Sequence, residues 1–538
     1  MLVFNYTQPF PSRRSPVLGR NGAVSTSHPL AAQIGLQVLA DGGNAIDAAI
    51  ATAAALTVLE PTSNGLGSDA FAIVWDGNKL HGLNASGRSP KELTLDIMQS
   101  KSEERGGEQR VPLTGWLPVT TPGAVSAWMA LAERFGTMPL SRLVEPGAKY
   151  AEVGHPVPPT VAHYWSFSEK RFPNMQDFWA TFMPKGRAPR AGELFSCPEQ
   201  AATLRLIGES NGEAFYHGEL ADAIAKHASS TGGYLTKADL AQHRPEWVDP
   251  ISTNYRGYDV WEIPPNGQGI TALIALNILE GFDMNSYPQL SSERLHLIIE
   301  ALKLAFADAH GYVADPQKVD VPIKGLLSKA YAKARRALID PTKAMPGPEP
   351  GDPLGDTVYL CTADRDGRMV SYIQSNYMGF GSGIVVPGTG ITLQNRGCGF
   401  SLKEDHPNVY APGKRPYHTI IPSFITKEGV PLAAYGVMGG DMQPQGHMQV
   451  VSSIVDYKLN PQAAMDAPRV RVLEDGGVSL EPTINPEIAR ELAKLGHSVR
   501  IDAERAGFGG GQMIWRDPEN GVYIAGSEPR QDGQAVAF

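Results

Sequence analysis

The hydrophobic positions near the start of the chain alternate between helical and strand-like spacing. Residues 28–43 carry apolar side chains at helical spacing, and a second helical pattern covers residues 45–60. The second segment consists almost wholly of small and apolar residues, so we expect it to be buried between layers. Short apolar runs at 23–26 and 70–75 are typical of strands. This alternation predicts helices packed on a sheet.

Helical and strand-like patterns also alternate along the rest of the chain. Further helices are predicted at 124–134, 219–228, 291–312, 444–455, 460–466 and 484–496, and further strands at 384–386, 420–425 and 431–435. Because both halves hold helices and strands, the sequence predicts mixed α/β layers.

One segment breaks this regularity. Residues 340–356 contain five prolines and three glycines, which predicts an extended, exposed linker. Directly after it, residues 357–375 alternate like a β-hairpin around an Asp-Arg-Asp-Gly turn at 364–367. Thr357 is therefore predicted to be the first residue of a strand that follows a linker.

Composition and charge exclude several classes of function. The 538 residues include 47 basic and 56 acidic side chains, a net charge of -9, which argues against nucleic acid as a partner. No apolar run is long enough to span a membrane, and the first residues lack a secretion signal, so we expect a cytoplasmic protein with no membrane partner. Three cysteines fit reduced thiols, and we expect Cys361 and Cys398 to be small buried hydrophobic residues.

The glycine-rich turns do not match nucleotide-binding motifs. The turns at 379–383, 386–390 and 435–441 lack the spacing of phosphate-binding loops. The 13 histidines form no metal-binding pair of the H-E-x-x-H type, and no G-x-S-x-G elbow is present. We therefore expect neither a metal nor another cofactor.

Several longer motifs, in a fixed order along the chain, are similar to those of a known protein family. They are GGNAIDAAIATAAALTVLEPTSNGLGSDAF, FYHGELADAI, GGYLTKADLA, NYRGYDVWEIPPNGQG, HLIIEALKLAFADA, DTVYLCTADRDG, NYMGFGSGIVVPGTGI, KRPYHTIIPS and GVMGGD. With these motifs the chain resembles the γ-glutamyltranspeptidase family of N-terminal-nucleophile hydrolases. The resemblance implies an α/β (α+β) fold, the four-layer αββα sandwich. It also implies that the protein is made as an inactive precursor.

The resemblance also implies where the precursor cuts itself. The cleavage site falls between Asp356 and Thr357, giving a large subunit of residues 1–356 and a small subunit of residues 357–538. The two products are expected to stay together as a heterodimer within one sandwich, and such heterodimers could assemble further into a homo-oligomer. The freed α-amine of Thr357, with a reference pKa of about 8, can serve as general base for its own hydroxyl.

Three further positions match the family's catalytic motifs. Ser375 stands where the family has a second threonine beside the nucleophile, so a hydroxyl is kept. Gly439 and Gly440 match the glycines whose N–H groups face the oxyanion of the tetrahedral intermediate. By contrast, Asn64, Asp69 and the glycines between them are expected to form a structural turn.

Other positions depart from the family pattern. Ser86 replaces the arginine that holds a glutamyl α-carboxylate, and Arg88 follows two residues later. Gly399 replaces the aspartate that holds the α-ammonium, and His418-Thr419 replaces a pair of serines. Losing a charged contact weakens recognition of a zwitterionic glutamyl group.

Arg396 is a new cation next to the lost aspartate. Its guanidinium could bind a substrate carboxylate, or it could pair with an acid such as Asp441. The expected substrate-binding residues are Arg396, His418, Thr419, Arg88 and Asn376.

Three functions remain open on the sequence. The first is a self-processing amidohydrolase that hydrolyses, or transfers, γ-glutamyl groups from small-molecule amides such as glutathione. The second is hydrolysis of a small carboxylated amide such as oxamate, because the motifs around Arg396 resemble the divergent branch of the family that includes glutathione-hydrolase-like proenzymes and oxamate amidohydrolase. The third is an unprocessed, non-catalytic scaffold.

Overall fold

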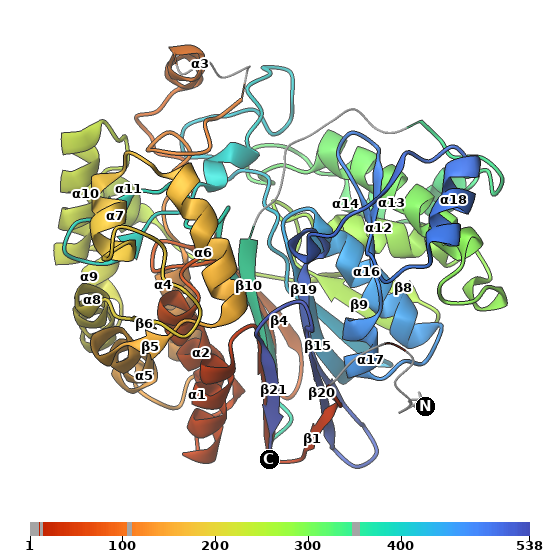
Figure 1. The fold of residues 1–538 in the computed structure, drawn as a ribbon, viewed down its shortest axis with the longest axis horizontal. Coiled ribbons are helices and arrows are strands. Elements are labelled where there is room, and N and C mark those ends of the chain that lie inside the picture. Colours follow the sequence, from red (N-terminus) through yellow and green to blue (C-terminus); the bar gives the residue numbers. More distant parts are fainter. Residues whose placement is uncertain (1–9, 11–13, 105–109, 347–355) are drawn as a thin grey trace.

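The centre of the molecule is a pair of seven-stranded sheets packed face to face (Figure 1). The computed structural model describes residues 10, 14–104, 110–346 and 356–538, without the side chains of residues 356, 505 and 506. Strand neighbours in both large sheets are antiparallel.

The first sheet holds the predicted hairpin at its middle. Its order is β21 (Gln534–Ala537), β2 (Gly22–Thr26), β10 (Asp356–Asp364), β11 (Met369–Tyr377), β3 (Asp69–Trp75), β4 (Leu80–Asn84) and β7 (Glu246–Val248). The second sheet runs β1 (Val17–Gly19), β20 (Tyr523–Ser527), β19 (Gly510–Arg516), β15 (Val430–Met438), β14 (Ser423–Lys427), β9 (Tyr258–Glu262) and β8 (Ile251–Tyr255).

Apolar side chains from both sheets fill the layer between them. Phe71 and Tyr359 of the first sheet pack in one cluster with Phe424 and Ala434 of the second. Cys361 lies in this cluster, so its prediction as a buried hydrophobic residue is confirmed, whereas Cys398 is only partly buried.

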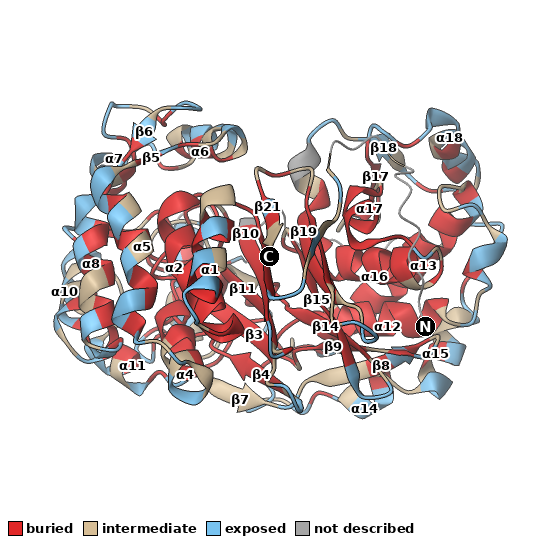
Figure 2. Cartoon of the chain, turned by 90° about the horizontal axis from the view of Figure 1, so that it is seen from below, coloured by how far each residue is buried: buried red, intermediate tan, exposed pale blue. Residues whose placement is uncertain are grey.

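Helices cover the outer face of each sheet (Figures 1 and 2). The first sheet packs against α1 (Pro29–Ala40), α2 (Ala45–Leu59) and α4 (Ala124–Phe135). On the far side of α2 lies α5 (Leu140–Val153), and α8 (Pro198–Glu209) packs on α5. The second packs against α12 (Gly269–Leu279), α16 (Met442–Val455) and α17 (Pro461–Asp466), and α13 (Ser292–Tyr312) packs on α12. The predicted four-layer αββα sandwich is therefore confirmed.

The position of helix α2 explains why its residues are small and apolar on all sides. All of its residues are buried, because it lies between the first sheet and the helices α1, α4 and α5. Its start is fixed by a capping box in which Asn44 and Asp47 bond each other's backbone N–H groups.

Both sheets contain strands from either side of residue 356. In the first sheet, β10 and β11 insert between β2 and β3, and in the second, β14 pairs with β9. Neither part of the chain could complete a sheet alone.

The start of the predicted linker is exposed but anchored. Asp340 accepts a hydrogen bond from His296 through its carbonyl (2.8 Å), and Met345 is held by Glu300 and Lys303 on α13 (2.9 and 3.0 Å). Residues 340–343 and 346 are exposed, as predicted, although residues 340 and 345 are hydrogen-bonded to α13, and residues 347–355 of the predicted linker lie outside the described residues. In the described part of the chain, none of the helices combines the length and apolar character needed to cross a membrane.

Candidate active site

Thr357 lies beside Ser375 in the middle of the first sheet. Its hydroxyl donates a hydrogen bond of 3.1 Å to Ser375 Oγ, and only 1% of Thr357 is exposed. The two residues come from adjacent strands of the β10–β11 hairpin. The structure thus brings the predicted nucleophile and its predicted hydroxyl partner together.

An irregularity in the hairpin creates this juxtaposition. Between β10 and β11 the register shifts at Thr357, so that Ser375 and Asn376 together oppose this one residue. The next residue, Tyr377, has a φ of 79°, which a residue with a Cβ rarely adopts. Such local strain is typical of functional sites, where the surrounding fold holds the backbone in place.

Arg396 completes the polar cluster around Thr357. It lies in the 3-10 turn η2 (Arg396–Gly399), and its Nη2 donates to Ser375 Oγ (3.1 Å) while Nη1 donates to Thr419 Oγ1 (2.6 Å). Its guanidinium also stacks over the Tyr377 ring at 4.4 Å. Burial lowers the pKa of Arg396 to about 10, and Asp69 acts against this shift, so the side chain stays charged at neutral pH.

The charge of Arg396 has no close counter-ion. Among the described residues, no carboxylate lies within 4.0 Å of this guanidinium, and its Nε has no hydrogen-bond partner. The ion pair with Asp441 that the sequence left open is not formed. Because an unpaired buried charge is costly, a cation in this position is typical of a site that receives an anion.

Asp69 and His418 form a buried pair next to this cluster. Asp69 pairs with Ser375 in the register of β3 and β11, and its Oδ2 lies 3.0 Å from His418 Nε2. Burial raises the pKa of Asp69 to about 7 against the opposing charge of Arg396. Burial, with Arg396 and Arg415, holds the pKa of His418 well below its usual value, which favours a neutral ring.

These contacts change two expectations. Asp69, expected to serve only a structural turn, belongs to the polar surroundings of Thr357 and Ser375. Both ring nitrogens of His418 are engaged, since Nδ1 also accepts from the N–H of Ile420 (3.4 Å). The predicted contact between His418 and the substrate stays a prediction, and these hydrogen bonds argue against it because they occupy both ring nitrogens.

Gly439 and Gly440 form a turn at the N-terminus of α16. Their φ values are +124° and +58°, and a Cβ on Gly439 would approach Gly509 Cα to 3.0 Å. No described residue accepts a hydrogen bond from either N–H group. Successive free N–H groups at a helix N-terminus attract an anion, as an oxyanion hole requires.

Arg88 lies in a different ion-pair cluster. It pairs with Asp315 (3.0 Å) and Glu246 (3.2 Å). Ser86 donates to Asn84 Oδ1 (2.7 Å) instead of presenting a charge. The guanidinium of Arg88 takes no part in the described hydrogen bonds of Thr357, and its role in substrate binding stays a prediction.

Asn376 and Gly399 are also committed to the fold. The amide of Asn376 bonds the hydroxyls of Ser68 (2.9 Å) and Thr392 (3.0 Å). At Gly399, a Cβ would meet the carbonyl oxygen of Tyr417 at 2.5 Å. An aspartate could therefore not stand at this position without a backbone shift.

Sequence reasoning missed three residues of the site: Asp69, Tyr377 and Gln268. The signal for Gln268 was its place in the motif PPNGQG, but nothing in that motif says which atoms the side chain meets. Its amide donates to the carbonyls of Thr419 (2.7 Å) and Gly440 (3.0 Å).

Within the described residues, one group of side chains has the composition of a metal site. His296, Glu300 and His497 are buried together on and beside α13. The ammonium of Lys303 lies 3.0 Å from Glu300 and 3.5 Å from His497, so a cation already occupies this cluster. It is not part of the site around Thr357.

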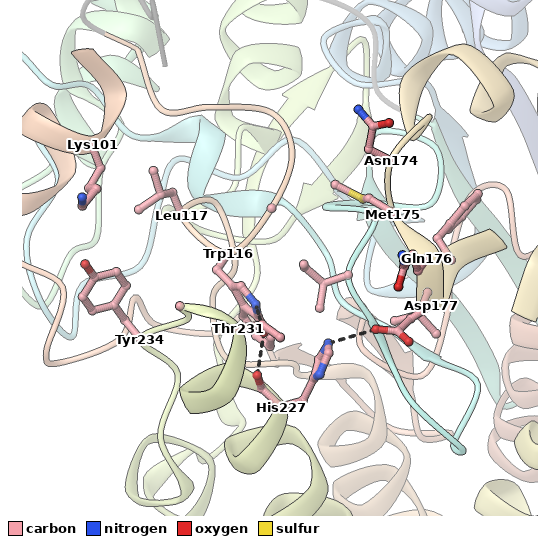
Figure 3. Close-up of a pocket in the computed structure, with 16 residues that line it drawn as sticks. Lys101, Trp116, Leu117, Asn174, Met175, Gln176, Asp177, His227, Thr231 and Tyr234 are labelled. Atoms are coloured by element: carbon pink, nitrogen blue, oxygen red, sulfur yellow. Dashed lines mark hydrogen bonds and ion pairs between the residues drawn. The ribbon is translucent and has the colours of Figure 1, made fainter. Parts of the chain in front are cut away.

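A separate pocket of about 370 Å³ lies between α7 (Gln176–Phe182) and α10 (Glu219–Thr231) (Figure 3). Trp116 forms part of its wall, held by a hydrogen bond to Thr231 (2.8 Å). None of the residues around Thr357 described above lines it.

Comparisons with known proteins agree on one group of enzymes. A family model described as gamma-glutamyltranspeptidase matches residues 31–538. The chain is 37% identical to the glutathione hydrolase-like YwrD proenzyme of Bacillus subtilis, over 97% of this chain and 99% of that protein. It is 33% identical to the oxamate amidohydrolase proenzyme of Klebsiella pneumoniae, over 96% and 98%. The crystal structure of cephalosporin acylase from Bacillus halodurans superimposes with a TM-score of 0.93 and 54% identity, over 100% and 99%.

Proposed function

Because the chain belongs to the gamma-glutamyltranspeptidase family, whose named relatives include amidohydrolases and acylases, we propose that it is a proenzyme that cuts itself before Thr357. The Thr357 hydroxyl attacks the carbonyl carbon of Asp356, and the peptide bond becomes an ester while the nitrogen becomes a free amine. Water then hydrolyses the ester and releases the carboxylate of Asp356. The products are a large subunit of residues 1–356 and a small subunit of residues 357–538.

The new α-amine of Thr357 is the general base of the amidohydrolase. It takes the proton of the Thr357 hydroxyl as that oxygen attacks the substrate amide, and passes the proton to the departing amine. An acyl-enzyme ester remains, which water hydrolyses. The N–H groups of Gly439 and Gly440, with the N-terminus of α16, stabilise the oxyanion in both steps.

The substrate class follows from the charge of Arg396. A buried guanidinium that contacts Ser375 Oγ and Thr419 Oγ1 but no carboxylate presents a charge to whatever binds beside the nucleophile. Arginine suits a carboxylate because its N–H groups match the two oxygens. We infer that the acyl group carries a carboxylate close to the scissile carbonyl, as in a mono-amide of a small dicarboxylic acid.

A γ-glutamyl amide is the second candidate. Its carboxylate would also suit Arg396, but its ammonium needs an acid, and no side chain fits at Gly399. One observation favours it: Asp441, next to Gly440, is close enough for its charge to raise the pKa of Tyr377, although burial is the larger cause. Asp441 is thus the acid that could receive the ammonium.

A substrate series separates these candidates. The cleaved enzyme is assayed with oxamate, with a longer mono-amide of a dicarboxylic acid, with a γ-glutamyl amide, and with a neutral amide of matched size. We expect a kcat/KM at least about 100-fold higher for the carboxylated amides than for the neutral one, since each charge-assisted contact is worth a few kcal/mol. Equal rates for neutral and carboxylated amides would contradict the role of Arg396, and a preference for the γ-glutamyl amide alone would favour the second candidate.

A further inference from the structure

A buried glutamine from the first part of the chain connects the two halves of the site. Gln268 directly precedes α12, and its Nε2 donates to the carbonyl oxygens of Thr419 (2.7 Å) and Gly440 (3.0 Å). The hydroxyl of Thr419 accepts a hydrogen bond from Arg396. One amide group therefore contacts both the segment beside the guanidinium and the glycine turn.

The orientation of this amide is fixed from its other end. The hydroxyl of Tyr417 donates to Gln268 Oε1 (2.9 Å), and the N–H of Gln268 donates to the carbonyl of His418 (2.9 Å). Because carbonyl oxygens only accept, the two N–H bonds of Nε2 face them, and Oε1 is left to accept from the Tyr417 hydroxyl. Gln268 and Tyr417 are both buried, so water cannot readily replace these bonds.

The hydrogen bond from Gln268 to the carbonyl of Gly440 affects the shape of the Gly439–Gly440 turn. The Gly440 N–H shares a peptide plane with the Gly439 carbonyl, and the φ and ψ angles of Gly440 join that plane to the next one, which contains the Gly440 carbonyl. Because glycine has unusual backbone freedom, both planes must be held for the turn to keep one shape. The N–H of Met442 holds the carbonyl of Gly439 (3.0 Å), which fixes one plane. Gln268, together with the N–H of Gln443 (3.1 Å), holds the carbonyl of Gly440 and fixes the other.

We propose that Gln268 is a positioning residue that aligns the Gly439–Gly440 turn with Thr357, and that Tyr417 keeps its amide in the working orientation. The inference rests on the proposed function, because it concerns the oxyanion formed at Thr357. Gln268 acts through Gly440 and does not touch the substrate. A preorganised donor contributes to the rate only if it is held in place before the charge develops.

The test follows acylation of Thr357 by a neutral β-lactone, measured by intact mass at several lactone concentrations. The Thr357 hydroxyl attacks the lactone carbonyl, the ring C–O bond breaks, and the released oxygen takes the proton, leaving an ester on Thr357. This reaction passes through an oxyanion but needs no carboxylate, so it does not depend on Arg396. The variants are Gln268→Glu, which keeps the shape but removes the donor, and Tyr417→Phe, which keeps the amide but removes its orienting hydroxyl.

A matched control is Gln200→Glu on α8. Gln200 is buried and its Nε2 donates to the carbonyl of Thr57 (3.0 Å), outside the described contacts of Thr357. We expect Gln268→Glu to lower the maximal acylation rate by about 10- to 100-fold, with the half-saturating concentration within about threefold of wild type. Tyr417→Phe should give a smaller loss of the same kind, and Gln200→Glu should behave as wild type.

Three outcomes count against the inference. A folded, cleaved Gln268→Glu enzyme with a maximal rate within about twofold of wild type overturns it, as does a loss confined to the half-saturating concentration. If Gln268→Glu does not fold, Tyr417→Phe decides by the same criteria. A wild-type protein that is not acylated at Thr357 overturns the proposed function itself, and the inference falls with it.

Discussion

Arg396 and Thr357 bond the same oxygen atom. The guanidinium donates to Ser375 Oγ at 3.1 Å, and the nucleophile donates to it at 3.1 Å as well. The proposed anion-binding group is thus one hydroxyl away from the proposed nucleophile. Arg396, Ser375 and Thr357 therefore form one hydrogen-bonded cluster.

Replacing Arg396 should change substrate preference more than stability. Arg396→Met removes an unpaired buried charge, so we expect the free energy of unfolding to stay within about 1 kcal/mol or to rise. The kcat/KM for a carboxylated amide should fall by about 100-fold or more, while that for a neutral amide should change little. Steady-state kinetics on both amides, with urea unfolding, checks this.

Arg396→Lys is the matched control for charge. It keeps a cation but loses the fork that contacts Ser375 and Thr419 together, so it should recover only part of the activity. If Arg396→Lys had the wild-type kcat/KM for the carboxylated amide, the positive charge alone would be sufficient for recognition, and the forked geometry of the guanidinium would not be needed.

The pair of Asp69 and His418 predicts a pH dependence of stability. With its pKa raised to about 7, folded Asp69 holds a proton between about pH 4 and 7 that the unfolded chain has lost. The folded state then binds more protons, so this group lowers stability as pH rises through that window, by at most about 1.4 kcal/mol per pH unit, and adds little further slope above about pH 8. His418, whose pKa is lowered, has the opposite slope below its unfolded value.

The difference between wild type and Asp69→Asn isolates the Asp69 contribution, because His418 stays buried in both. Urea unfolding at pH 4.5, 6 and 8 should show the variant gaining stability relative to wild type as pH rises. A difference that is constant with pH would show that Asp69 keeps an ordinary pKa.

Gly399→Asp tests whether the missing acid is a matter of space. The new Cβ would meet the Tyr417 carbonyl at 2.5 Å, so we expect a loss of about 1–3 kcal/mol and no gain toward γ-glutamyl amides. Gly311→Asp, at a glycine with nothing within 4 Å, is the control for adding the same side chain. Unchanged stability together with improved γ-glutamyl kcat/KM would show that the turn can accept the acid.

The buried cluster at Lys303 should respond to loss of its ammonium but not to chelators. Lys303→Met leaves Glu300 buried without its cation, so we expect a loss of about 3–5 kcal/mol. Lys324→Met, at an exposed lysine, should change stability by less than about 0.5 kcal/mol. A Tm that falls on adding EDTA to wild type would contradict the view that Lys303 is the resident cation.

Local sequence patterns were sufficient to predict many of the helices and strands. The apolar run of α2 and the alternation of β10 and β11 were found because burial on all sides and a strand period leave clear marks in the sequence. The start of β14 was placed too early, at residue 420 instead of Ser423, and the strands β19 and β20 were not predicted. Ends of elements depend on hydrogen bonds to distant strands, which no local pattern contains.

The site was predictable only where a motif marked it. Thr357 and Ser375 came from the resemblance, and the structure confirms that they are adjacent. Asp69 was missed because its role depends on β3 pairing with β11, some 300 residues later. The choice between an ion pair and an unpaired Arg396 likewise needed the positions of its neighbours.

The most direct measurement is the intact mass of the purified protein over time near pH 8, for wild type and Thr357→Ala. The account predicts that wild type resolves into fragments of residues 1–356 and 357–538, while Thr357→Ala keeps the full-length mass. A full-length mass in both proteins, or cleavage in both, would contradict the assignment of Thr357 as nucleophile. The first of these results would favour an unprocessed scaffold.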